Sequence, residues 1–544
     1  MKWFKDNPVG LILIACIPLF IINLGELYVN IMEARNFITA REMLVDDHWI
    51  FTTINGEPRY QKPPLPTWLT AFSGALFGMK NLWALRLPAA LAASLLAVYG
   101  YKLSHKQTQN KQLSLIGAFV LMTSFYILFS GRNGQWDIFT HAFMMGGIYF
   151  LYLFFENDSK RYKNAFLAAV LVGASFMSKG PVSLYALFLP FLIAYGFVYK
   201  FRGFGKKWLP LAMFLVVTVV LSGWWYWYTY TYDPIAVKEI TDRETANWTS
   251  YNIRPFYYYW SFFTQSGIWT IPAFVGLLYP YLKNRVSNKK DYTFSLIWTL
   301  GSVVLLSVIP EKKSRYLLPV LIPMAWNTAY YLEYLILKFK EVKDRRETIP
   351  VYFNFGLIGS IGLVFPFVGV FVLPGLIDGD GSLVWYILLG LSLLITGLFI
   401  LRNLIRKNIQ KVMFGVIAFV MAIMCFGMPL SRNMSENLAF RPMSELAAQN
   451  LDFPIYEYAF FTPEMTFDYG KPLPVLYQNN RLNLPEASTF GVLVSKEKEE
   501  AFNAHFKDAT IQKIDAFDMN PQPSESSSHK TRLARTLYKI TVSQ

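Results

Sequence analysis

About thirteen apolar runs divide the first 430 residues of the chain, each near the length that a helix needs to cross a bilayer. The hydrocarbon core takes roughly 20 residues of α-helix. The runs centre on residues 9–29, 83–101, 113–131, 137–155, 164–178, 181–199, 208–230, 257–282, 292–309, 316–337, 352–374, 383–401 and 412–429. Backbone polar groups must be paired internally in lipid, so such segments fold as helices. We therefore predict a mainly α, polytopic membrane protein with about 13 transmembrane helices.

The composition excludes other classes of protein. Only 16% of the 544 residues are charged, against about 25% in soluble proteins, and 54% are apolar, which excludes a soluble enzyme and a disordered scaffold. The net charge of +15 comes from short basic clusters between the apolar runs, so no nucleic-acid partner is expected. The two cysteines, Cys16 and Cys425, both lie in apolar runs and predict neither a disulfide framework nor a cysteine metal site.

The charge of the loops predicts how the chain is oriented. Basic residues gather in alternate loops, at 102–111, 160–163, 200–207, 283–290, 338–346 and 402–411. The opposite short loops are nearly free of them, and the loop at 378–382 is acidic. Because basic loops stay in the cytoplasm, we expect a cytoplasmic N-terminus, an extracytoplasmic C-terminus and a location in the cytoplasmic (inner) membrane.

The composition changes after Pro429, and this change predicts a second domain. Residues 431–544 are polar and contain no membrane span. Alternating apolar residues predict strands at 453–461, 490–495 and 537–542, and helices are expected at 435–449 and 496–506. We therefore divide the chain into a transmembrane domain, 1–430, and a small C-terminal α/β extracytoplasmic domain, 431–544.

The first outer loop, about 32–82, is long and rich in polar residues. Its first part has helical spacing and predicts an amphipathic helix on the membrane surface over 32–44. Glu33 would lie at the helix N-terminus with Arg35 beside it, where a carboxylate and a guanidinium can serve as base and phosphate clamp. An ordinary surface helix is the alternative.

Further along this loop, an Asn-Gly turn at 55–56 is followed by Arg59, Lys62 and a run of prolines. The prolines fix an extended approach to a helix predicted over 68–77. Lys62 is thereby held on a rigid stretch, which suits a phosphate ligand, and we include Arg59 in the same group. A lysine that anchors the chain at the membrane interface is the alternative interpretation.

These motifs resemble those of a known family. The order Glu-Ala-Arg, Ala-Arg-Glu-Met-Leu, Asn-Gly-Glu-Pro-Arg-Tyr and Lys-Pro-Pro-Leu within 33–65 is similar to the first periplasmic loop of aminoarabinose (lipid A) transferases. The resemblance continues through 86–88, Asp137, 179–181 and 313–319. These enzymes are grouped with the protein O-mannosyltransferases among the integral-membrane GT-C glycosyltransferases. The resemblance implies a polyprenyl-phosphate-linked sugar donor and an acceptor that is lipid A, a protein or another glycan.

The chain departs from the family pattern at two positions. Met32 stands where the family usually has an aspartate, so the role of base would pass to Glu33 or Asp137, and a degenerate, inactive member is a further alternative. Gln61 replaces a carboxylate that resembles a metal ligand of the lipid A enzyme. The chain has only five histidines, so a divalent metal has little support, and no cofactor is predicted with certainty.

Charged residues elsewhere complete the predicted site. Asp137 opens the fourth span, where an acid is costly and is usually functional or paired; Arg132 is its expected partner if the role is structural. The remaining predicted phosphate ligands lie in tight outer turns: Lys179, Lys312, Lys313 and Arg315. The outer loop 231–256 supplies Asp242 and Glu244 as candidates for sugar contact.

Together these residues predict a glycosyltransferase at the outer face of the membrane. A carboxylate would deprotonate or orient the acceptor, and the basic residues would stabilise the leaving polyprenyl phosphate during an inverting displacement. A transporter or flippase for lipid-linked sugars is the alternative from another class, and it would show broken helices at the bilayer midplane and internal repeats. An O-antigen ligase-like enzyme would differ only in its donor.

Overall fold

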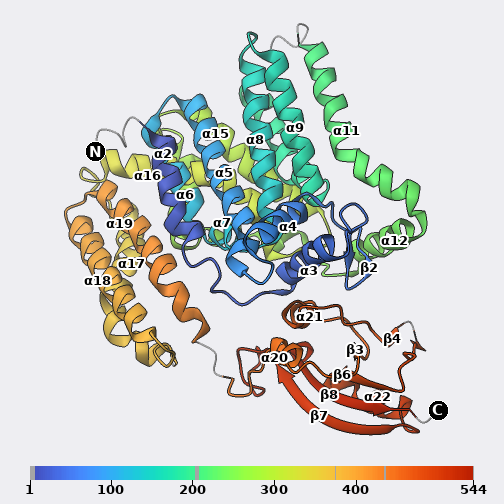
Figure 1. Ribbon diagram of the computed structural model, residues 1–544. Coiled ribbons are helices and arrows are strands. Elements are labelled where there is room, and N and C mark those ends of the chain that lie inside the picture. Colours follow the sequence, from blue (N-terminus) through green and yellow to red (C-terminus); the bar gives the residue numbers. More distant parts are fainter. Residues whose placement is uncertain (1–6, 202–206, 374, 434–436, 479, 543–544) are drawn as a thin grey trace.

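The computed structural model describes residues 7–201, 207–373, 375–433, 437–478 and 480–542. A bundle of helices forms the larger part, and a small sheet domain lies against one end of it (Figure 1). Residues 1–6 and 202–206, which carry part of the predicted basic stretches, lie outside the described residues. The chain is mainly helical, as predicted.

The α-helices of the first part are α2 (Pro8–Cys16), α3 (Ile31–Val45), α4 (Leu65–Phe77), α5 (Leu82–Thr108), α6 (Lys111–Thr123), α7 (Phe125–Gly131), α8 (Asp137–Glu156), α9 (Arg161–Lys179), α10 (Leu189–Val198), α11 (Trp208–Tyr232), α12 (Pro234–Ser250), α13 (Thr270–Gly276), α14 (Tyr279–Leu282), α15 (Lys289–Val308), α16 (Leu318–Lys338), α17 (Arg345–Val372), α18 (Ser382–Ile405) and α19 (Ile409–Ala422). The C-terminal domain adds α20 (Met443–Ala448), α21 (Pro463–Tyr469) and α22 (Glu499–His505).

Seven helices among the described residues are long and apolar enough to cross a membrane, or up to eight if α6 and α7, bent by 66°, form one span. Two shorter apolar helices cover Pro8–Ile21 and Leu184–Val198. The exact number of 13 spans is therefore not confirmed, although a polytopic membrane protein is. Helices α9 and α16 also follow predicted runs and are long enough to cross a membrane, but they are not among the helices that are sufficiently apolar.

The predicted span at 257–282 is wrong as a single helix. The structure has two 3₁₀ segments there, Phe256–Tyr259 and Phe262–Trp269, followed by the short helices α13 and α14. Gly267 has a φ of +66° inside the second segment, which breaks the helical path. The apolar run thus did not indicate the backbone conformation of this segment.

The helical hairpin of α17 and α18 stands at one side of the bundle (Figure 1). Its two helices approach closely at glycines, where there is no room for a side chain. A Cβ added to Gly362 would lie 2.6 Å from the carbonyl oxygen of Leu393, and a Cβ added to Gly397 would lie 2.7 Å from the carbonyl oxygen of Gly359. Close backbone approach through glycine is typical of helix pairs in membranes.

Helix α3 is not the surface helix that its spacing predicted, because most of its side chains are buried. It packs between α4 and α21 of the C-terminal domain, where the rings of Phe37 and Phe467 lie 5.3 Å apart. Its Glu42 is buried and accepts hydrogen bonds from Thr53 Oγ1 at 2.6 Å and Asn55 N at 2.7 Å. This carboxylate thereby fixes the tight hairpin of β1 (Thr53–Ile54) and β2 (Glu57–Pro58).

The C-terminal domain contains a four-stranded sheet in the order β3-β6-β8-β7. Strand β3 pairs with β6 in parallel, and the other pairs are antiparallel. The strands are β3 (Ile455–Glu457), β6 (Thr489–Val494), β7 (Thr510–Asp518) and β8 (Ala534–Thr541), with a separate pair β4 (Tyr477–Gln478) and β5 (Arg481–Leu482). Three of the four lie where strands were predicted; β7 was missed because most of its residues are polar or exposed.

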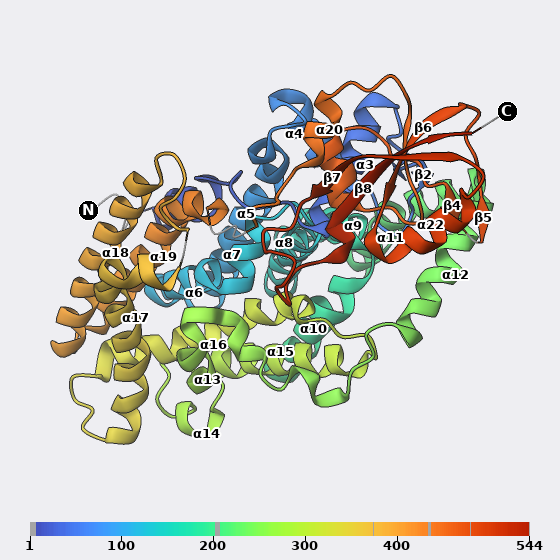
Figure 2. The ribbon, with the colours of Figure 1, turned by 90° about the horizontal axis from the view of Figure 1, so that it is seen from below.

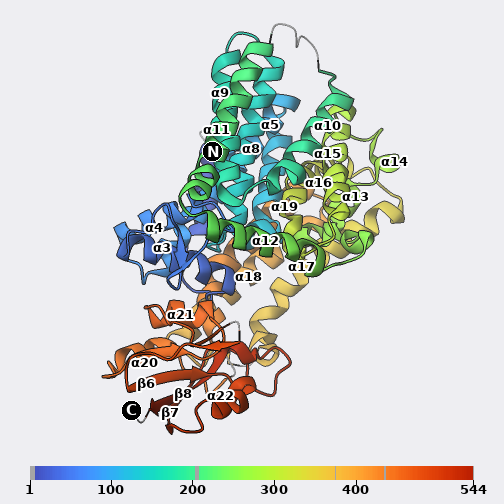
Figure 3. The ribbon, with the colours of Figure 1, turned by 90° about the vertical axis from the view of Figure 1, so that its right-hand side faces the viewer.

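The C-terminal domain docks on the first outer loop, so both lie at the same end of the bundle (Figures 2 and 3). The side chain of Asn55 makes two hydrogen bonds with the backbone of Leu473, at 2.7 and 2.8 Å. Arg41 donates to the carbonyl oxygen of Thr466 at 3.4 Å. Two segments about 400 residues apart therefore form one surface over the ends of the helices.

Candidate functional site

Buried polar atoms without a hydrogen-bond partner gather at the start of α8. Of 18 such side-chain atoms among the described residues, seven belong to residues 130–141. They include Trp136 Nε1, Asp137 Oδ2, Thr140 Oγ1 and His141 Nδ1. Buried polar groups in folded proteins are nearly always paired, so such a concentration is typical of a place that binds a polar ligand. This segment is packed under the first outer loop, because Asn36 donates to the carbonyl oxygen of Gly134 at 2.8 Å.

Asp137 forms a buried ion pair with Lys179, which ends α9. One carboxylate oxygen accepts the hydrogen bond from Lys179, and the other is the unpartnered Oδ2 among the described residues. The expected structural partner, Arg132, instead donates to the carbonyl oxygens of Leu19, Ile22 and Asn23 at 2.7–3.0 Å. Asp137 and Lys179, predicted separately, thus meet at one place.

Lys62 lies in the same neighbourhood as this pair. The pKa of Lys62 is lowered to about 8, chiefly by burial and then by the positive charges of Lys179 and Arg59, while the negative charges of Glu244 and Asp137 act in the opposite direction. A lysine with such a pKa is partly desolvated and surrounded by like charge, which is the condition expected of a ligand for an anion. Glu244, on α12, thus acts electrostatically on Lys62.

Three arginines surround this cluster. The guanidinium of Arg59 is buried against the ring of Trp136, 4.6 Å from its centroid, and donates to Thr39 Oγ1 at 3.0 Å. Arg315 acts electrostatically on both Asp137 and Arg35, and its Nε is buried with no partner among the described residues. The basic residues Lys62, Lys179, Arg59 and Arg315 thus outnumber the carboxylates of Asp137 and Glu244.

Glu33 lies in a different environment from the one expected of a base. Its Oε1 accepts from Arg86 Nε at 2.7 Å and Gly134 N at 2.8 Å, and its Oε2 accepts from Arg86 Nη2 at 3.1 Å and from Asn30. Both Glu33 and Arg86 are fully buried. A carboxylate with all its lone pairs engaged has none left for an acceptor, so this geometry favours a structural role for Glu33.

Two of the predicted phosphate ligands are likewise engaged with the protein itself. Lys312 is buried and donates to the carbonyl oxygens of Ile309 at 2.6 Å and Arg254 at 3.0 Å, which holds two segments together. Lys313 pairs with Glu311. Asp242 is exposed on α12, whereas Glu244 is half-buried. Within this set, Arg315 acts electrostatically on Asp137 and Glu244 on Lys62.

Sequence reasoning missed several residues of this site. Arg86 was seen only as part of a motif, and nothing in its spacing indicated the pair with Glu33, 53 positions away. Trp136 and His141 lie on either side of Asp137. His141 was assigned to the apolar run of the fourth span and Trp136 directly precedes that run, and neither was singled out as a site residue. The position of His141 one helical turn after Asp137 was the available signal.

Among the residues that the structure describes, no group of three or more His, Cys, Asp or Glu side chains could hold a metal ion. Gln61 precedes Lys62 at the edge of the site and is half-buried. The residues gathered here offer cations for an anion rather than oxygen ligands for a metal.

Comparison with known proteins agrees with the motifs. The family described as dolichyl-phosphate-mannose-protein mannosyltransferase matches residues 61–227. A protein of Pseudomonas savastanoi named undecaprenyl phosphate-alpha-4-amino-4-deoxy-L-arabinose arabinosyl transferase is 25% identical over 313 residues, 54% of this chain and 55% of its own length. A protein of the same kind from Proteus mirabilis is 24% identical over 61% of this chain and 60% of its own. The chain thus spans little more than half the length of these relatives.

Among solved structures, ArnT of Cupriavidus metallidurans bound to undecaprenyl phosphate matches with a TM-score of 0.67 at 15% identity, covering 97% of both chains. Its apo state matches with a TM-score of 0.68 at 16% identity, covering 98% of both chains. The chain has the fold of ArnT. Its sequence relatives and its fold together make it similar to the GT-C glycosyltransferases of the aminoarabinose transferase and O-mannosyltransferase kind, as its motifs predicted, and it is a multi-pass membrane protein.

Proposed function

We propose that the chain is a glycosyltransferase that moves a sugar from a polyprenyl-phosphate donor to an acceptor outside the cytoplasmic membrane. The observation that carries this proposal is the ion pair of Asp137 and Lys179 beside Lys62, at an end of the bundle rich in buried, unpartnered polar atoms. A single phosphate with an apolar chain matches such a site, because basic residues gather there at the end of membrane-spanning helices. The acceptor is lipid A, a protein or another glycan.

The chemistry follows from the charges. Lys62, Lys179 and Arg315 stabilise the negative charge that grows on the leaving phosphate as the bond to the anomeric carbon breaks. Asp137 Oδ2 orients the acceptor hydroxyl or phosphate and takes its proton where there is one. The acceptor oxygen then bonds to the anomeric carbon on the face opposite the departing polyprenyl phosphate, which inverts the configuration of the sugar. Arg35, Arg59 and Glu244 line the approach, and Glu33 with Arg86 holds the first outer loop in place. We keep 1–430 and 431–544 as the proposed domains.

We expect donor binding to weaken as the pH rises through about 8. The charged form of Lys62 binds the phosphate, and its lowered pKa of about 8 means that this form is lost above that value. A polyprenyl-phosphate sugar is a phosphodiester whose own charge stays constant in this range. Titration of purified protein from pH 6.5 to 9.5 should show up to about tenfold weaker binding, the size of one charge-assisted contact.

The matched variant Lys62→Arg tests the assignment of this pH dependence. Arginine stays charged over the whole range, so its binding curve should be flat above pH 7. A flat curve for the native protein, or the same decline in the arginine variant, would show that another group controls donor affinity.

We also propose that the N-terminus is cytoplasmic and the C-terminal domain extracytoplasmic. The docking of Asn55 on Leu473 supports a shared side for this domain and the first outer loop. A reporter that is active only outside the membrane should work when fused after Gln544 and fail when inserted in the loop 338–346. The reverse pattern would place the site on the cytoplasmic side.

The function itself is tested with purified protein in detergent. Incubation with undecaprenyl-phosphate sugars and candidate acceptors should release undecaprenyl phosphate in step with glycosylated acceptor, both measured by mass spectrometry. Movement of the donor across vesicle membranes without cleavage would instead identify a transporter. Comparing outer lipids and glycoproteins of cells with and without the gene would then name the acceptor.

A further inference from the structure

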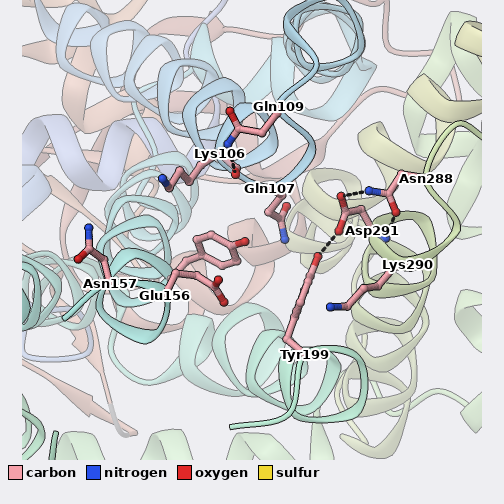
Figure 4. Close-up of a pocket in the computed structure, with 10 residues that line it drawn as sticks. Lys106, Gln107, Gln109, Glu156, Asn157, Tyr199, Asn288, Lys290 and Asp291 are labelled. Carbon is pink, nitrogen blue, oxygen red and sulfur yellow. Dashed lines mark hydrogen bonds between the residues drawn. The ribbon is translucent and has the colours of Figure 1, made fainter. Parts of the chain in front are cut away.

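A cavity of about 470 Å³ lies at the opposite end of the bundle from the candidate site. It is formed by the C-terminal ends of α5, α8 and α10 and the N-terminal end of α15 (Figure 4). These are ends of membrane-spanning or apolar helices, so the cavity lies at the level of lipid headgroups. None of the residues predicted for glycosyl transfer lines it.

The lining carries charges of both signs. Lys106 and Lys290 supply two cations, and Glu156 and Asp291 supply two carboxylates. Both oxygens of Asp291 are engaged, one by Tyr199 Oη and the other by Asn288 Nδ2 at 2.6 Å. Because the lining has both positive and negative side chains, the cavity suits neither a simple anion nor a simple cation.

Three side chains of the cavity, Gln107, Glu156 and Lys106, each keep a polar atom without a hydrogen bond or ion pair to the described part of the chain. Gln107 Nε2 is buried and has no hydrogen-bond partner there. Glu156 accepts from Tyr195 Oη on Oε1 at 2.7 Å, and no hydrogen bond to its Oε2 occurs among the described residues. The side-chain amine of Lys106 likewise forms no ion pair there. Two hydrogen-bond donors, the cationic Lys106 and the neutral Gln107, and the anionic acceptor Glu156 thus stand at opposite parts of one cavity.

The backbone strengthens this division. Glu156 ends α8, whose C-cap is Asn157, so the partial negative charge of this helix end adds to that of the carboxylate. The single N-terminus, that of α15, carries Lys290 and holds partial positive charge. A ligand that carries a cationic amine and an anionic phosphate on one short linker can place the amine near Glu156 and the phosphate near the basic side chains.

An apolar stripe leads away from this cavity. Leu189, Ile193 and Phe197 follow one another at intervals of four along α10 and are 42%, 37% and 75% exposed, just before Tyr199. Residues at this spacing share one face of a helix. Acyl chains can lie along such a face while their headgroup occupies the polar cavity.

We propose that this cavity binds the headgroup of an ethanolamine phospholipid, with its amine toward Glu156 and its phosphate toward Lys106 and Gln107. The assignment goes beyond the proposed glycosyl transfer and does not depend on it. If the proposed orientation of the chain is right, the lipid belongs to the cytoplasmic leaflet.

The test uses the full-length protein reconstituted in nanodiscs of equal parts phosphatidylethanolamine, phosphatidylglycerol and phosphatidylcholine. Lipid that remains after a stringent detergent wash is identified by native mass spectrometry. The native protein should retain phosphatidylethanolamine roughly tenfold over either other lipid, the size of one charge-assisted hydrogen bond. Equal retention of the three lipids, or preference for phosphatidylglycerol, would overturn the proposal.

Variants locate the binding to this cavity. Glu156→Gln keeps an oxygen that accepts from Tyr195 but replaces Oε2, the acceptor for the ammonium N–H groups, by an N–H donor, so the preference over phosphatidylcholine, which has no such N–H group, should disappear. Lys106→Met should reduce retention of all phospholipids at this site, and Lys102→Met, exposed on the same helix, is the matched control. If folding of either variant is disturbed, Gln107→Leu provides a neutral third test by the same readout. Unchanged retention in the folded variants would place the lipid elsewhere and contradict the proposal.

Discussion

Replacing Asp137 by Asn should lower the rate of sugar transfer by about 10²–10⁴-fold, the usual loss when a positioned acid or base is removed. The variant keeps the size of the side chain and one hydrogen bond to Lys179, but loses the charge that would attract the acceptor proton. Donor binding should survive, because the basic residues that hold the phosphate remain. The measurement is transfer from a purified polyprenyl-phosphate sugar, with donor binding followed in parallel.

The control for this prediction is Asp242→Asn. Asp242 is exposed on α12 and makes no ion pair among the described residues, so transfer should stay within about twofold of the native rate. Full transfer by Asp137→Asn would take the role of base from Asp137. Loss of donor binding together with transfer would instead mean that the pair with Lys179 is chiefly structural.

Replacing Arg86 by Met should destabilise the protein by about 3–5 kcal/mol, because it leaves the carboxylate of Glu33 buried without its partner. Glu33 and Arg86 are both fully buried, and the pair joins α3 to α5 and to Gly134. We expect the first outer loop to lose its packing before the rest of the bundle unfolds. Thermal unfolding in detergent and proteolysis of the loop provide the readout.

Lys338→Met is the matched control, since Lys338 forms an exposed pair with Glu341 whose loss should cost less than about 1 kcal/mol. Glu33→Gln completes the set. If the role of Glu33 is structural, Glu33→Gln should be less stable than the native protein. Its transfer activity per folded molecule should nevertheless be higher than that of Asp137→Asn. A stable Glu33→Gln protein without any transfer would restore Glu33 as the base.

The sequence was most informative where one property dominates. Apolar runs located the helices of the bundle because lipid demands both length and hydrophobicity, and alternation located β3, β6 and β8. It was less informative where a helix is covered by distant chain. Helix α3 has a spacing that predicted a surface helix, but α21, more than 400 residues later, covers it. No local pattern contains that information.

The candidate site shows the same limit. Asp137, Lys179 and Lys62 could be named individually, because an acid or a lysine at a helix end near the membrane surface is unusual. That these side chains lie close together could not be predicted, since Asp137 and Lys179 are 42 positions apart in the sequence and on two different helices. Glu33 and Lys312 were named by the same reasoning, yet each meets a partner in the protein. Charge at the right depth identifies candidates, and only packing separates a free group from an engaged one.

The most direct measurement is photocrosslinking of the full-length protein with a polyprenyl-phosphate probe that carries a diazirine next to the phosphate. We expect labelled peptides from the first outer loop around Lys62 and from the segment around Asp137. We also expect that excess undecaprenyl phosphate removes the labelling and that the combined Lys62→Ala and Lys179→Ala variant lowers it at least about tenfold. Labelling confined to other parts of the bundle, or unchanged in that variant, would contradict a polyprenyl-phosphate site built on Asp137, Lys179 and Lys62.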